Sequence, residues 1–136
     1  MTSVVSETPF AASDIAARHF AGKLGFETDP ADVEQAFSHG TVDFVLLDVR
    51  GPQLYARSHV PGAINLPHGK MTERRMAEWP MDTLFVVYCQ GTHCNGSTKA
   101  ALRLALQGRP VKEMIGGLDG WIADEFAVAS LVAEPA

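Results

Sequence analysis

The sequence predicts an α/β domain of three layers, with a mainly parallel central sheet flanked by helices. Two short apolar runs, at 44–47 and 83–88, carry this prediction, because strands buried on both faces are typical of parallel sheets. The third observation is that strand and helix patterns alternate along the chain. The 136 residues fit one domain, with a core at about 13–126, a loose arm at 1–9 and a C-terminal tail at 127–136.

Start and stop signals place the other elements. Ser13-Asp14 can cap a helix that continues over 15–20, and Asp29-Pro30 begins a helix over 31–38. Turns are expected at Val60-Pro61-Gly62 and at Gly116-Gly117, and Pro80 stops a charged helical stretch. The remaining elements are strands at 23–28, 63–67 and 111–115, and helices at 53–58, 71–79, 97–107 and around Trp121-Ile122.

Composition excludes several classes of function. The net charge of −5 and the pI of about 5.4 argue against nucleic-acid binding, which needs a basic face. No apolar run approaches the ~18 residues of a membrane span, so no membrane partner is expected. The first eight residues hold no Lys or Arg and do not resemble a signal peptide. We therefore expect a cytoplasmic protein whose two cysteines are free thiols rather than a structural disulfide.

One loop combines the features that thiol chemistry needs. Cys89 follows the apolar run at 83–88 directly, and a glycine-bearing loop then leads into the helix at 97–107. Ligands bind outside the carboxyl ends of parallel strands, and loop amides beside a helix N-terminus attract anions and favour a thiolate. A free cysteine, with a pKa near 8.5, is mostly a thiol at neutral pH. The expected binding residues are Gln90, Gly91, Thr92, His93, Cys94, Asn95, Gly96 and Ser97.

From about residue 13 to residue 126, the chain resembles the rhodanese-like family. Three stretches carry the resemblance, in the family's order and spacing: 47–50 (LDVR) with 59–67 (HVPGAINLP), the strand ending in Cys89 with 97–104 behind it, and Gly116-Gly117 with Trp121. The resemblance implies a rhodanese fold and sulfur transfer through a cysteine persulfide. The donor would be a small sulfur-containing anion such as thiosulfate, the acceptor a thiol or a protein, and no cofactor is implied.

The loop departs from the family pattern in length and in its second cysteine. It is about two residues longer than usual, and it resembles a subgroup in which two cysteines precede Asn-Gly, as in Cys94-Asn95-Gly96. Cys89 matches the family position after the strand and is the favoured nucleophile. Cys94 is the alternative nucleophile, or a resolving cysteine that attacks an oxidised or persulfidated Cys89 to form an internal disulfide.

For the other polar residues near the loop, both a structural role and a functional role are considered. For Asp48 and Arg50 a structural ion pair is favoured over a catalytic role. His59 is expected to pack or hydrogen-bond before its turn, whereas His93 either lowers a thiol pKa or faces solvent. Lys99 is the only fixed positive charge near the loop. No metal site is expected, because Cys-x4-Cys is not a usual zinc spacing and a fourth ligand is not evident.

Two other functions remain open. A phosphatase or arsenate reductase of the same fold is ranked low, because this loop lacks the arginine that clamps an oxyanion. A non-catalytic or redox-sensing module that uses the Cys89–Cys94 pair is the stronger alternative. The chain is expected to be a monomer or a homodimer.

Overall fold

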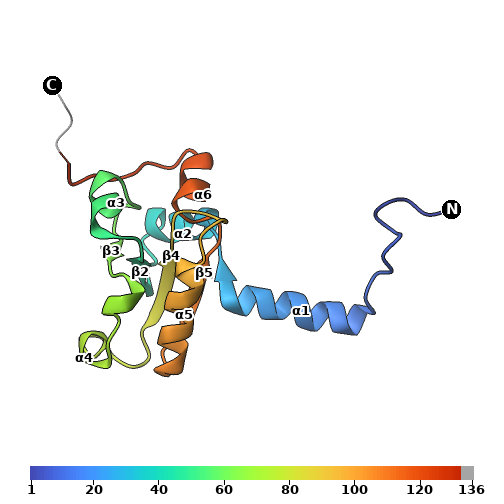
Figure 1. Cartoon of the computed structure of the whole chain (residues 1–136), viewed down its shortest axis with the longest axis horizontal. Coiled ribbons are helices and arrows are strands. Elements are labelled where there is room, and N and C mark those ends of the chain that lie inside the picture. Colours follow the sequence, from blue (N-terminus) through green and yellow to red (C-terminus); the bar gives the residue numbers. More distant parts are fainter. Residues whose placement is uncertain (133–136) are drawn as a thin grey trace.

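The computed structural model describes residues 1–132 and contains twelve helices and strands (Figure 1). In chain order they are α1 (Ser13–Phe26), β1 (Glu27–Thr28), α2 (Pro30–Ser38), β2 (Phe44–Asp48), α3 (Pro52–Arg57), β3 (Ile64–Asn65), η1 (His68–Lys70), α4 (Glu73–Met76), β4 (Leu84–Tyr88), α5 (Gly96–Leu106), β5 (Val111–Met114) and α6 (Gly117–Ala123).

All five strands form one sheet in the order β1-β5-β4-β2-β3, and every pair is parallel. The α/β class and the parallel sheet predicted from the sequence are therefore confirmed. In the register, Asp48 at the end of β2 lies opposite Tyr88 at the end of β4. Asp48 is also aligned with Asn65 on β3. The carboxyl ends of three strands thus meet at one edge, where the cysteine loop begins.

The period-2 alternation of the strands divides the core into two halves. Phe85 and Val87 of β4 point to the face covered by α5 and α4, where they pack with Ala100, Leu104 and Met76. Val86 and Tyr88 point to the opposite face, which α2 and α6 cover with Val33, Leu118 and Trp121. The sheet is therefore the middle of three layers, with apolar side chains on both faces.

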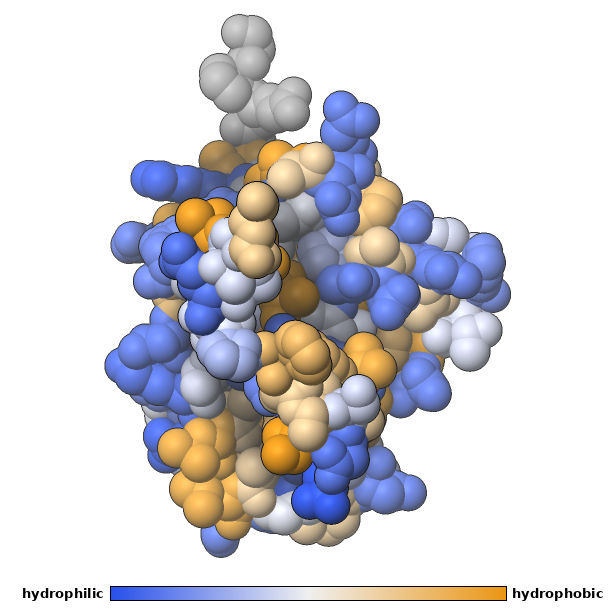
Figure 2. All heavy atoms as spheres, turned by 90° about the vertical axis from the view of Figure 1, so that its right-hand side faces the viewer, coloured by the Kyte–Doolittle hydropathy of each residue, from blue (hydrophilic) through white to orange (hydrophobic). Residues whose placement is uncertain are grey.

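Helix α1 corrects the strand expected at 23–28. The helix continues through Phe26, and only Glu27 and Thr28 join the sheet, where they pair with β5. The alternation of apolar and polar residues at 23–28 did not make this segment a strand. Only the two residues that pair with β5 are extended, and the others continue the helix. Helix α1 projects from the body (Figure 1) and has no buried residue. Apolar side chains on this helix are exposed, and Figure 2 views the molecule from that side: Ile15, Phe20, Leu24 and Phe26.

The helix expected at 71–79 is also shorter than predicted. Only Glu73–Met76 is helical, with the Thr72 side chain accepting a hydrogen bond from the Arg75 N–H. Helix η1 precedes it, and turns lead from it to Pro80. Met76 is fully buried and Trp79 packs against the core, so tertiary contacts rather than helical continuity hold this stretch. The other expected strands and helices are present, with ends that differ by at most two residues, except that α1 continues six residues beyond the expected 15–20 and α6 begins at Gly117, four residues before Trp121.

The C-terminal segment returns to the body beside α3. Ala129 and His59 exchange two backbone hydrogen bonds of 2.9 Å, which form an antiparallel bridge. The Leu131 N–H donates to the Ala56 carbonyl at 2.8 Å. Residues 133–136 of the expected tail lie outside the described residues. Within residues 1–132, no helix is both long enough and apolar enough to cross a membrane.

Helix α5 offers a matched test of the core that supports the loop. Leu104 is fully buried against the sheet, whereas Leu106 on the same helix is exposed. We expect Leu104→Ala to lower the free energy of unfolding by about 2–5 kcal/mol, because it leaves a cavity. Leu106→Ala should change it by less than about 0.5 kcal/mol. Urea denaturation measures both values, and equal losses would contradict the packing described for α5.

Candidate active site

Cys89 reaches the α5 side of the sheet because it continues the alternation of β4. Phe85 and Val87 face the same way, and Cys89 belongs to their core cluster with Ala100 and Leu104. Its relative exposure is 7%, so most of the residue is covered. The sulfur is therefore held on a rigid strand end rather than on a mobile loop tip, which is a favourable setting for a positioned nucleophile.

The N-terminus of α5 lies directly beside this sulfur. Gly96 is the first helical residue, and no side chain caps the helix. A Cβ atom at Gly96 would lie 2.9 Å from the Cys89 Sγ and 3.4 Å from the Cys94 Sγ, so glycine leaves room for both sulfurs. The Gly96 N–H donates to the Cys94 Sγ at 3.4 Å. The partial positive charge of the helix end favours the thiolate form of a cysteine placed here.

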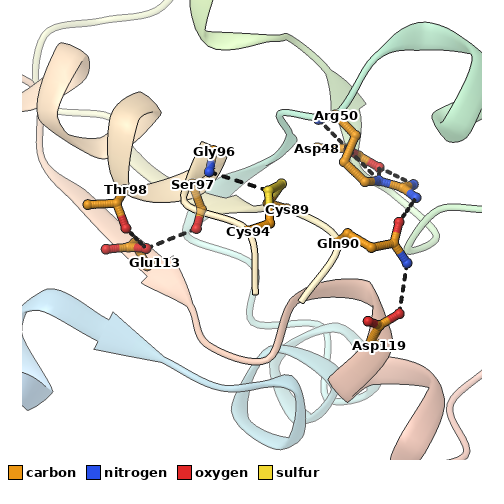
Figure 3. Close-up of a disulfide and its surroundings, with 10 residues drawn as sticks. All are labelled: Asp48, Arg50, Cys89, Gln90, Cys94, Gly96, Ser97, Thr98, Glu113 and Asp119. Carbon is orange, nitrogen blue, oxygen red and sulfur yellow. Dashed lines mark hydrogen bonds and ion pairs between the residues drawn. A yellow bond between two sulfur atoms is a disulfide. The ribbon is translucent and has the colours of Figure 1, made fainter. Parts of the chain in front are cut away.

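The two cysteines are joined in a disulfide, with Cα atoms 6.4 Å apart (Figure 3). The expectation of free thiols is therefore wrong for this structure. The loop between the cysteines makes a turn closed by a 3.1 Å hydrogen bond from the Cys94 N–H to the Gly91 carbonyl. This turn brings Cys94 back over Cys89, and the Cα separation falls in the range that disulfides bridge.

The start of α6 holds the base of the loop. The Leu118 N–H donates to the Cys89 carbonyl at 3.0 Å, and the Asp119 N–H donates to the Gln90 carbonyl at 2.8 Å. Gly117 permits this approach because a Cβ atom there would lie 2.9 Å from the Gly91 nitrogen and still closer to the Cys89 carbonyl. Its φ of +59° is also a conformation that favours glycine. The Gly-Gly turn of the sequence thus serves to dock α6 onto the loop.

A buried ion pair connects the strand ends to the loop. The Arg50 Nη2 lies 2.7 Å from the Asp48 Oδ2, and the Tyr88 hydroxyl donates to the same oxygen at 2.8 Å. The Arg50 Nη1 donates to the Gln90 Oε1 at 3.0 Å, and the Gln90 Nε2 donates to Asp119 at 2.7 Å. One chain of hydrogen bonds therefore runs from β2 and β4 through Gln90 to α6, and Figure 3 shows its part from Asp48 to Asp119.

Burial and this ion pair set the charge states of the network. Burial alone would lower the pKa of Arg50, but the hydrogen bonds and the charge of Asp48 outweigh it, so the pKa is raised. Burial raises the pKa of Tyr88 well above its usual range, and the negative charge of Asp48 raises it further. The raised pKa keeps the Tyr88 hydroxyl protonated at neutral pH, where it donates its hydrogen bond to Asp48.

Two cavities open on either side of the disulfide, and both are lined by Cys89 and Cys94. The Arg50 cavity, of about 630 Å³, is also lined by Arg50, Gly51, Leu54, Gln90, His93 and Asn95. The Glu113 cavity, of about 200 Å³, is lined by Gly91, Thr92, Ser97, Thr98, Glu113 and the turn from Met114 to Gly117. In Figure 3 the Glu113 side and the Arg50 side flank the two sulfurs.

A carboxylate points into the smaller cavity. The hydroxyls of Ser97 and Thr98 both donate to the Glu113 Oε2 at 2.9 Å. Nothing in the local sequence singles out this residue, because Glu113 lies inside an expected strand. Its position near the sulfurs follows from the pairing of β5 with β4 and from the packing of α5 on β5.

The structure gathers most of the expected site residues and leaves two apart. The residues of the loop line one or both cavities, except Gly96, which lies against the sulfurs. Thr92 and His93 are exposed, and Lys99 is exposed and lines neither cavity. His59 is buried elsewhere, with its Nδ1 2.7 Å from the Tyr55 carbonyl oxygen and its ring stacked on Tyr55. Sequence reasoning missed Glu113 and Asp119, whose positions depend on tertiary contacts.

The buried ion pair predicts a large effect of removing one charge. Asp48→Asn leaves the Arg50 guanidinium buried without a counter-ion, so we expect the free energy of unfolding to fall by about 3–5 kcal/mol. Asp119→Asn is the matched control, because that carboxylate is exposed and its amide can still accept from Gln90; we expect a change within about 0.5 kcal/mol. Denaturant unfolding measures both, and a loss below about 1 kcal/mol for Asp48→Asn would contradict this account.

Among the solved structures similar to this chain is the BH2092 protein from Bacillus halodurans. It aligns with a TM-score of 0.84 and 35% identity over 88% of each chain. The rhodanese-like domain of the Alr3790 protein from Anabaena sp. aligns with a TM-score of 0.68 and 25% identity, over 76% of this chain and 78% of that one.

Two of the proteins that are similar in sequence are a sulfurtransferase and a transcriptional regulator. The thiosulfate sulfurtransferase GlpE of Pseudomonas entomophila is 36% identical over 90 residues, which cover 65% of this chain and 79% of that protein. An HTH-type transcriptional regulator of Mycobacterium tuberculosis is 35% identical over 79 residues, 58% of this chain, and the match spans about a third (34%) of the regulator. The model of the rhodanese-like domain matches residues 29–124. The chain therefore belongs to the rhodanese-like domain family.

Proposed function

We propose that the protein is a sulfurtransferase that moves sulfane sulfur from a donor such as thiosulfate to a thiophilic acceptor. The observation that carries the proposal is the placement of Cys89: at the end of a buried strand, beside the N-terminus of α5, with a cavity on each side. Membership of the rhodanese-like family and the similarity to a thiosulfate sulfurtransferase support the same conclusion.

The cycle starts from the reduced protein. The Cys89 thiolate attacks the outer sulfur of thiosulfate, the S–S bond of the donor breaks, and sulfite leaves with the bonding electron pair. The product is a persulfide on Cys89. A nucleophilic acceptor then attacks the outer sulfur of the persulfide, and Cys89 leaves as a thiolate, which the helix end stabilises by up to ~2 kcal/mol. Because the disulfide removes the nucleophile, activity requires prior reduction.

The structure also favours a second function, redox sensing. The Cys89–Cys94 disulfide links β4 to the start of α5, so oxidation and reduction change the part of the fold that α6 and the Arg50 network contact. A protein that acts only as a sensor would form the disulfide reversibly without accepting sulfane sulfur.

Mapping the added sulfur distinguishes these functions and identifies the nucleophile. When the reduced Cys94→Ser variant, which keeps Cys89 as its single cysteine, is treated with thiosulfate, we expect intact mass spectrometry to show one added sulfur atom and peptide mapping to place it on Cys89. Cys89→Ser should take up no sulfur. Sulfur found on Cys94 in Cys89→Ser would make Cys94 the nucleophile, and no adduct with any sulfane donor would leave only the sensor.

The charge of Glu113 bears on which donor the site accepts. Thiosulfate is a dianion, and the Glu113 carboxylate stands in a cavity that both sulfurs line. At a few ångströms, two like charges near a protein surface repel each other by about 1–3 kcal/mol. We infer that Glu113 weakens the use of anionic donors and favours neutral or cationic persulfides.

Neutralising this carboxylate should therefore change donor preference. Glu113→Gln keeps an acceptor for Ser97 and Thr98, and we expect it to raise kcat/KM for thiosulfate about tenfold, or ~1.4 kcal/mol. With cysteamine persulfide, which carries an ammonium group, the same variant should be slower. Glu27→Gln is the control, because Glu27 pairs with Glu113 in the sheet but lines neither cavity. Equal changes with both donors would refute an electrostatic role.

A further inference from the structure

The second cysteine is the feature that the sulfur-transfer cycle above does not use. A persulfide cycle needs one nucleophilic cysteine, yet the loop returns Cys94 to Cys89 over a separation of five residues and bonds the two sulfurs. The backbone turn from Cys94 to Gly91 and the absence of a side chain at Gly96 make this approach possible. The backbone of the loop therefore holds Cys94 next to Cys89, and this placement suggests that Cys94 takes part in the reaction cycle.

The two cysteines differ in exposure and in support. Cys89 is buried in the core cluster, whereas Cys94 is half-buried and lies on the loop. The Gly96 N–H at the helix end donates to the Cys94 sulfur, which favours a thiolate at Cys94 as well. A second thiolate thus stands within bonding reach of the sulfur on which the persulfide would form.

We propose that Cys94 resolves the Cys89 persulfide and releases its sulfur as hydrogen sulfide, an activity that rests on the proposed function. The Cys94 thiolate attacks the Sγ of Cys89, and a bond forms between these two sulfurs. The bond from the Cys89 Sγ to the outer sulfur breaks, and the outer sulfur leaves as HS⁻ with the bonding electron pair. The sulfane sulfur is reduced to sulfide, and the two cysteines are oxidised to the disulfide.

The position of attack follows from the bond that the structure contains. Attack of Cys94 on the outer sulfur would only move the persulfide from one cysteine to the other and would form no disulfide. Attack on the Cys89 Sγ produces the Cys89–Cys94 bond directly. The two cavities that Cys89 and Cys94 line leave space beside the sulfurs, where the departing hydrosulfide can lie.

A dithiol supplied by another molecule then restores the protein. Cys94 is the more exposed partner, so an external thiolate attacks the Cys94 Sγ and Cys89 leaves as a thiolate. A second thiol of the reductant attacks the mixed disulfide at Cys94 and frees it. For each turnover, thiosulfate and a dithiol yield sulfite, hydrogen sulfide and an oxidised dithiol, so that atoms and electrons balance.

A single-turnover experiment without external thiol tests this step. Reduced wild-type protein, freed of reductant under anaerobic conditions, is mixed with thiosulfate, and sulfide, free thiols and intact mass are followed together. We expect one sulfide released per chain, loss of both thiols and a final mass without added sulfur. Cys94→Ser should instead retain the added sulfur on Cys89 and release no sulfide until dithiothreitol is added.

The outcomes separate the two proposals. If both wild type and Cys94→Ser retain a stable persulfide without sulfide, the resolving role of Cys94 is overturned and the sulfurtransferase stands. If neither protein acquires sulfur, the proposed function itself fails, and the resolving step fails with it. Should Cys94→Ser not fold, as judged by circular dichroism, the wild-type protein alone decides, because only resolution couples sulfide release to loss of both thiols.

Discussion

The buried contact of Asp48 with Arg50 is the interaction on which the site depends. Asp48 is fully buried at the end of β2, and its carboxylate binds the Arg50 guanidinium and the Tyr88 hydroxyl. Two charges without water are stable only when their remaining hydrogen bonds are satisfied. Arg50 meets that condition by donating also to the Ser58 carbonyl and to Gln90. Because the buried Arg50 guanidinium needs a hydrogen-bond acceptor for each of its donors, it holds the side chain of Gln90, the first residue after Cys89, in place.

Successive side chains of β4 point to opposite faces of the sheet, so the residue that anchors the strand end and the residue that carries the sulfur lie on different faces. Tyr88 points to the α6 side, where it joins the ion pair, and Cys89 points to the α5 side, where it meets the helix end. The backbone carbonyls of Cys89 and Gln90 are held by α6 at the same time. The sulfur is therefore positioned from both faces of the sheet, and the loop beyond it is free to bring Cys94 back without disturbing the strand.

The Cys89–Cys94 disulfide and the Glu113 carboxylate are the features of the site on which the proposed donor preference and sulfide release depend. A cysteine beside a helix end and an anion-tolerant cavity suit persulfide chemistry, whereas Glu113 opposes a dianionic donor on the other side of the sulfurs. Cys94 adds a second sulfur within bonding distance, so a persulfide here has an internal nucleophile. In the functions proposed above, donor choice and the fate of the sulfur therefore depend on two residues, Glu113 and Cys94, that lie outside the simple strand–cysteine–helix pattern.

The sequence by itself determined the α/β class, the parallel sheet, the place of the cysteine loop and the family, because buried strands, helix signals and ordered motifs are local patterns. Only the tertiary structure decided that α1 extends to Phe26, since a two-residue strand exists only through its partner. It also decided that the cysteines are bonded and that Glu113 faces them. Both facts depend on contacts between segments distant along the chain, or on the path of a turn, and neither leaves a periodic signal in the residues themselves.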